Sequence, residues 1–268
     1  MKLKIPNWGS LCKPNLLMNS DYRSGIINQK GITSLDKSDG STELGIDGWI
    51  QYGINCSVAT GSITFANRTS VIHTVQQPLD IKDLKAGDKV TFYASCFNIT
   101  GSVYIYLTGL DNQRKKLVNG DNEFTFTLTS SLEKLYILLA PNAVVSFNCM
   151  KLEPGEHFTG MPVWNEASEL YNCLERYQAG LYGELDPYFQ GENTTKFEII
   201  VKFQRPMKKL PTISKYSGLR VGKENITPTS INVKYMTLST VAIEVVTSKN
   251  YTLSNASIMG LELDGYTY

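Results

Sequence analysis

Histidine is scarce in this sequence, with only His73 and His157 among 268 residues. Most zinc sites and Ser-His-Asp triads use histidine as a ligand or a proton carrier, so this chain has little from which to build them. P-loop, GxGxxG, nucleophile-elbow and HExxH motifs are also absent, and no pair of carboxylates has a spacing that marks a glycosidase. Oxygen-rich loops such as residues 36–39 could hold calcium, but hairpin turns explain them with fewer assumptions. We therefore expect a protein that is not an enzyme, with no catalytic residue, no metal site and no cofactor.

Neither sign of charge is in excess. Lys and Arg number 26 against 25 Asp and Glu, which gives a net charge of +1. This balance indicates no attraction to nucleic acid or to an anionic membrane. Long hydrophobic runs are missing as well, because residues 135–145 are too few to span a bilayer and include Pro141 and Asn142. The first residues show no signal-peptide core, so we expect synthesis in the cytoplasm without Sec-type export and no membrane insertion.

Paired cysteines are not evident. The five cysteines are odd in number and scattered, and none forms a CxxC pair or a zinc spacing. For a chain without an export signal, buried free thiols are favoured over a disulfide framework.

Alternation of apolar and polar residues dominates the chain. Residues 89–97 place Val90, Phe92, Ala94 and Cys96 on one face, and residues 102–107 and 123–129 alternate in the same way. Turn residues separate these short segments, and no helix lies between them. This pattern predicts an all-β, antiparallel sandwich rather than a parallel α/β fold.

One segment, residues 165–180, has helical spacing instead. Asn165 suits the N-cap, Glu166 and Glu169 suit the first turn, and Gly180 suits the C-terminal end. Alternation returns in residues 196–203, 230–235 and 240–246, which predicts a smaller β-domain after this helix.

Several motifs occur in a fixed order along most of the chain. They are NLLMNSDYR at 15–23 with NQKG at 28–31, IDGW at 46–49, Gln76 or Gln77 before LKAGDKVTF at 84–92, KLEPG at 151–155, ELYNCLERY at 169–177 and FQRPMKKLPT at 203–212. Together they resemble the receptor-facing parts of bacteriophage tail fibres and related virion appendages, which have a carbohydrate-binding-module-like jelly roll.

The resemblance implies a domain organisation and an assembly. An N-terminal arm (1–14) would precede a jelly-roll sandwich (15–160), a linker helix (161–180) and a second, smaller β-sandwich domain (181–268). Such appendages are commonly trimeric, so a homotrimer in the virion is expected. The arm, which contains Trp8, would contact other virion proteins.

Four aromatic residues are candidates for ligand binding. Tyr93, Tyr104 and Tyr106 lie opposite the apolar face of their predicted strands, as aromatic residues do in glycan-binding sheets. A cross-strand ladder or a subunit contact is the alternative explanation, and the favoured one. Trp49 could stack on a sugar ring, although a core position is the favoured interpretation.

These observations favour a non-enzymatic tail-fibre or head-fibre protein that binds a host-surface glycan or protein. The alternative is a purely structural virion component, a decoration or connector without a ligand. A polysaccharide-degrading enzyme is a third possibility, weakened by the lack of a β-helix repeat or carboxylate motif. Jelly rolls host all three roles, so the fold alone cannot separate them.

Overall fold

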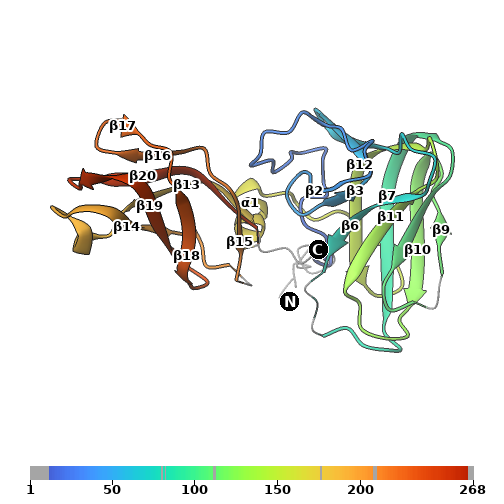
Figure 1. Cartoon of the computed structure of the whole chain (residues 1–268). Coiled ribbons are helices and arrows are strands. Elements are labelled where there is room, and N and C mark those ends of the chain that lie inside the picture. Colours follow the sequence, from blue (N-terminus) through green and yellow to red (C-terminus); the bar gives the residue numbers. More distant parts are fainter. Residues whose placement is uncertain are drawn as a thin grey trace, which may run out of the picture. The chain divides into compact units, whose positions relative to one another are not determined.

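The computed structural model describes residues 12–79, 81, 83–110, 113–175, 177–207 and 210–264 (Figure 1). Most of the arm expected at residues 1–14, including Trp8, lies outside the described residues. The chain divides into two compact units, Met1–Glu169 and Leu170–Tyr268. This boundary falls inside the range expected for the linker helix, 161–180.

In the part of the first unit that the structure describes, the strands form two six-stranded antiparallel sheets, drawn in blue to yellow in Figure 1. In spatial order, the first sheet contains β1 (Ser34–Leu35), β4 (Asn55–Ala59), β5 (Ser62–Ala66), β12 (Val144–Pro154), β7 (Lys89–Thr100) and β10 (Gly120–Thr127). The second sheet contains β2 (Thr42–Leu44), β3 (Ile50–Tyr52), β6 (His73–Pro78), β11 (Lys134–Leu139), β8 (Val103–Leu107) and β9 (Lys115–Lys116). From β5 to β8 each strand lies in the sheet opposite its predecessor, and the predicted antiparallel jelly-roll sandwich is confirmed.

The core of this unit follows the predicted alternation. Phe92 and Ala94 from β7, Ile105 from β8 and Phe147 from β12 are all fully buried in one hydrophobic cluster. All five cysteines belong to the described residues and none forms a disulfide, as expected. Four of them are buried, so their sulfur atoms pack as small apolar groups.

The motif residues at the N-terminal end of the sandwich form a buried polar network. The Gln77 side chain accepts a hydrogen bond from the Met18 amide (2.8 Å) and donates one to the Met18 carbonyl (2.9 Å). Asn19 donates to the carbonyls of Ile27 (2.7 Å) and Asp47 (2.9 Å). Because each side chain satisfies backbone groups of a distant segment, this network fixes residues 18–27 against the strands.

Residues 154–160 form a strap over the outer face of the first sheet. Beneath it lies a fully buried ion pair, in which the Lys151 Nζ is 2.9 Å from a Glu153 carboxylate oxygen. The ammonium also donates to Thr159 Oγ1 (3.1 Å) and to the Gly160 carbonyl (2.6 Å). The Thr159 amide donates to Glu153 at 2.7 Å, so the buried charges are paired and hydrogen-bonded.

One α-helix, α1 (Glu166–Leu174), occurs in the described part of the chain, and no helix there is long and apolar enough to cross a membrane. It starts as predicted, since Asn165 Oδ1 accepts a hydrogen bond from the Ser168 amide (2.9 Å). The expected continuation to Gly180 is wrong. The buried Gln178 side chain donates to the Leu174 carbonyl (2.9 Å), and a strand begins at Tyr177.

Counted over its described residues, the second unit has eight strands in one sheet, orange to red in Figure 1, where the sequence predicts a second sandwich. They are β13 (Tyr177–Leu185), β14 (Asn193–Lys202), β15 (Thr212–Lys215), β16 (Gly218–Val221), β17 (Glu224–Asn225), β18 (Ser230–Met236), β19 (Thr240–Thr252) and β20 (Ala256–Asp264), with a short 3-10 turn, η2, at Pro187–Phe189. Leu219 of β16 and Ile231 of β18, from opposite ends of the sheet, reach one core cluster. The sheet must therefore curl around its core, and irregular pairing between β13 and β20 and between β18 and β19 supplies bends.

Candidate functional site

The three tyrosines that the sequence singles out lie on two different sheets. Tyr104 and Tyr106 lie on β8 in the second sheet, whereas Tyr93 lies on β7 in the first sheet. All three point away from the core, but the outer faces of the two sheets look in opposite directions. Tyr93 points outward as its alternation predicts, but it does not share a face with Tyr104 and Tyr106, because alternation identifies an outward residue without identifying its sheet.

One face of the Tyr93 ring is already occupied. It stacks on Phe158 of the strap, with ring centroids 3.8 Å apart and planes inclined by 5°. Its hydroxyl donates to Asp121 Oδ1 at 2.9 Å. Burial, and then the hydrogen bond to Asp121, raise the pKa of Tyr93 to about 12. This side chain holds the strap in place.

Trp49 is a core residue and not a surface platform. Its side chain is 0% exposed, its ring lies 6.3 Å from that of Phe65, and its Nε1 donates to the Asn19 carbonyl at 3.2 Å. A sugar cannot reach this ring, so the structure overturns its candidacy for ligand binding and agrees with the favoured core interpretation.

A cluster of tyrosines remains on the outer face of the second sheet. We call it the tyrosine face and define it by Tyr52, Tyr104, Tyr106 and Tyr136, which are all half-buried. Tyr52 and Tyr136 are not among the residues predicted from the sequence. Tyr136 lies in an almost wholly apolar run, and Tyr52 ends a three-residue strand, so neither shows clear alternation.

Strand register brings these rings together. Tyr136 on β11 lies directly opposite Tyr106 on β8, with ring centroids 5.7 Å apart. On its other side Tyr136 lies opposite Gln76 on β6. Gln76, only 2% exposed, donates through Nε2 to the Tyr52 hydroxyl at 2.7 Å. Three neighbouring strands and β3 thus hold the rings in fixed positions.

The tyrosine face is uncharged at its centre. Burial raises the pKa of Tyr136, with further contributions from Tyr52 and Tyr106, and burial also raises the pKa of Tyr52. These hydroxyls therefore stay protonated at neutral pH and act as hydrogen-bond donors and acceptors. Lys116 on the edge strand β9 lies opposite Tyr104 and supplies a positive charge at the margin. Such a surface can stack on the C–H face of a sugar ring and bond to its hydroxyls.

The oxygen-rich loop at 36–39 uses its carboxylates for its own turns. Asp36 Oδ1 accepts a hydrogen bond from the Ser38 amide (2.9 Å), and Asp39 Oδ1 accepts one from the Ser41 amide (2.9 Å). Within the described ranges, no group of three or more His, Cys, Asp or Glu side chains is arranged to hold a metal ion.

Comparisons with known proteins give structural neighbours but no family. No family model and no curated protein sequence matches the chain. A protein described as sugar-binding, from Bacteroides thetaiotaomicron VPI-5482, is 13% identical, covers 53% of this chain and 100% of its own, and has a TM-score of 0.29. Discoidin II from Dictyostelium discoideum is 10% identical, covers 75% of this chain and 82% of its own, and has a TM-score of 0.23.

Proposed function

We propose that this protein binds carbohydrate, without catalysing a reaction, through the tyrosine face of its first unit. The observation that carries the proposal is the pairing of Tyr106 with Tyr136 beside the hydrogen-bonded Gln76 and Tyr52. Rings held by strand register lose little freedom on binding, so stacking on a sugar costs little ordering entropy. Neutral hydroxyls at the same face match the donors and acceptors of a glycan.

The biological setting that we propose is a bacteriophage appendage, a tail or head fibre that attaches to a host-surface glycan or protein. It is supported by the order of motifs between residues 15 and 212. Two of these motifs supply the buried network of Asn19, Asp47 and Trp49, which gives them a structural role in a jelly roll. In this setting the chain would act as a trimer in the virion, next to other virion proteins.

The test compares a double variant, Tyr106→Ala with Tyr136→Ala, with the unmodified protein on an array of purified bacterial surface polysaccharides. We expect binding of the recognised polysaccharide to weaken by about 1–3 kcal/mol, the range for truncating aromatic residues at an interface. The melting temperature should change little, because both rings lie outside the hydrophobic core.

Tyr216→Ala is the matched control, since this tyrosine is 38% exposed between β15 and β16 of the second unit. It should leave polysaccharide binding unchanged. If the double variant instead melts much earlier and binds as before, the rings are packing residues. The tyrosine face is then a structural surface, as expected for a virion component without a ligand.

A further inference from the structure

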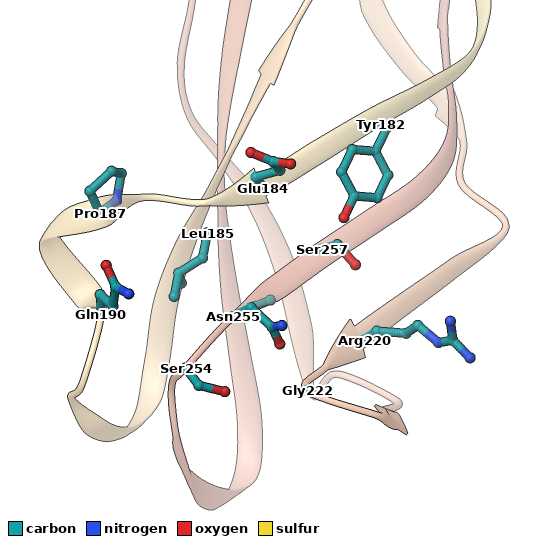
Figure 2. Close-up of a pocket in the computed structure, with 11 residues that line it drawn as sticks. Tyr182, Glu184, Leu185, Pro187, Gln190, Arg220, Gly222, Ser254, Asn255 and Ser257 are labelled. Atoms are coloured by element: carbon teal, nitrogen blue, oxygen red, sulfur yellow. The ribbon is translucent and has the colours of Figure 1, made fainter.

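The second unit has a polar hollow of about 440 Å³, which the tyrosine face does not involve (Figure 2). Strands β13, β16 and β20 border it, together with the segments 187–190 and 254–255. All of these elements belong to the second unit. The volume lies within the range of about 300–1,000 Å³ that is typical of small-molecule sites.

The hollow arises from a row of unequal side chains across three strands. Ser257 on the central strand β20 lies opposite Glu184 of β13 on one side and opposite Arg220 of β16 on the other. The preceding residue, Ala256, is buried in the core, so alternation turns Ser257 outward. Because Ser257 has a short side chain and its neighbours Glu184 and Arg220 have long ones, the surface of the sheet is depressed at Ser257.

Backbone hydrogen bonds tie the rim together without a ligand. The Gly222 amide donates to the Asn255 carbonyl (3.0 Å), and the Gly191 amide donates to the Leu253 carbonyl (2.6 Å). The Leu253 amide in turn donates to the Glu192 carbonyl (2.8 Å). Three loops that are distant in sequence are thus fixed to one another, which lowers the ordering cost of binding.

The lining combines one aromatic ring with several hydrogen-bonding groups. Figure 2 shows Tyr182 directed toward Ser257, with Asn255 between Gln190 and Arg220. The Tyr182 side chain is 54% exposed, so its ring is accessible. Amide and hydroxyl groups in this arrangement can donate and accept at the same time.

The two charged residues at the margin differ in how they are held. Arg220 Nε donates to Asn225 Oδ1 at 2.9 Å, which fixes the guanidinium at the rim. Glu184 is exposed, and within the described part of the chain its carboxylate has no ion pair or hydrogen bond. The charges of one acidic and one basic group balance, so the lining favours a ligand without net charge. Its hydrogen-bonding groups fit a ligand with many hydroxyls.

We propose that this polar hollow is a second saccharide-binding site, which takes a hexose-sized ring from a neutral sugar. The ring would lie against Tyr182, with neighbouring hydroxyls donating to Glu184 and bonding to Asn255 and Ser257. The inference is independent of the function proposed for the tyrosine face, because it rests on residues of the other unit.

The experiment uses saturation-transfer NMR on the full-length chain carrying Tyr106→Ala and Tyr136→Ala, which disable the tyrosine face. The probes are glucose, galactose, mannose, rhamnose, N-acetylglucosamine and their common disaccharides. At least one probe should show transfer from the protein. Adding Glu184→Gln should weaken its affinity about tenfold, the usual effect of losing a hydrogen bond to a charged group.

Glu192→Gln is the matched control, because the side chain of this exposed glutamate is not among those that line the hollow and the substitution makes the same change of charge. It should leave the affinity unchanged. Equal losses in the two glutamate variants overturn the proposed site, and so does a complete absence of transfer. If transfer occurs in the unmodified protein but disappears in the tyrosine variant, the sugar binds only at the tyrosine face. That result removes the second site and leaves the first proposal intact.

Discussion

Asp47 shows how a single buried carboxyl group shapes the N-terminal end of the sandwich. It is 1% exposed, and one of its oxygens accepts a hydrogen bond from the Gln29 amide at 3.0 Å. Burial raises the pKa of Asp47 from 3.8 to about 6, even though this hydrogen bond favours the charged form. The folded state therefore binds the Asp47 proton more tightly than the unfolded state does.

Asp47→Asn should consequently change how stability depends on pH. Above pH 6 the folded protein holds an ionised buried carboxylate, whose full cost is about 3 kcal/mol for a pKa raised from 3.8 to about 6. That cost disappears as the pH falls from about 6 to about 3.8, whereas asparagine does not titrate. Urea unfolding between pH 4 and pH 7 should show the unmodified protein gaining stability relative to the variant toward low pH. A difference that stays constant over this range would contradict the assignment.

Individual residue roles were harder to predict from the sequence than strand faces. Trp49 occurs in a turn-like motif, and its buried Nε1 finds its hydrogen-bond partner at Asn19, 30 residues earlier. Tyr93 alternates correctly, yet its ring is covered by Phe158 from the strap. Both contacts join segments that are far apart in sequence, and no local periodicity reports them.

At the scale of elements, the strap depends on a buried charge pair whose partners are two residues apart on β12. Removing one partner leaves the other charge buried and unpaired, which is strongly destabilising. Replacing both removes this cost, although hydrogen bonds to Thr159 are lost.

Lys151→Met should therefore lower the free energy of unfolding by about 3–5 kcal/mol. The double variant Lys151→Met with Glu153→Met should recover part of that loss. Lys89→Met is the control, because its ion pair with Glu156 (2.8 Å) is exposed and should matter much less. Urea titrations of the variants measure these differences. Equal losses at Lys151 and Lys89 would mean that the buried pair does not anchor the strap.

The helix illustrates what local sequence determines. Its start follows from Asn165, whose side chain caps the first turn as predicted. Its end depends on Gln178, which also donates to the Arg205 carbonyl (2.6 Å) and accepts from the Gln204 amide (2.8 Å). A helix end fixed by a segment 26 residues later could not be located from spacing alone.

For the whole molecule, each unit has its own hydrophobic core, yet the second unit leaves large apolar side chains uncovered. Tyr171 is 56% exposed on α1, and Val233 and Tyr235 are each 49% exposed on β18, which ends the sheet. Tyr177, by contrast, is buried within its own chain. We propose that copies of the chain associate through α1 and the second unit.

Light scattering on the full-length protein should then give the mass of a trimer. Leu170→Glu with Tyr171→Glu should produce a monomer, since charges at an apolar contact oppose association. A fragment ending at Glu169 keeps the complete first core and should also be monomeric. A monomeric full-length protein at micromolar concentration would rule out the proposed assembly.

The order of strands in the first sheet also determines when each strand can pair with its neighbours during synthesis. β5 pairs with β4 at once, but its other neighbour is β12, so that Ala66 meets Val144 almost 80 residues later. At about 5–20 residues per second, the ribosome needs several seconds or more to supply that partner. During this interval the hydrogen-bonding edge of β5, which carries Ile63 and Phe65, is open to other nascent chains. Slower translation, or a crowded polysome, should therefore lower the yield of soluble protein. The stability of the folded protein should not change, because the exposed edge exists only during synthesis.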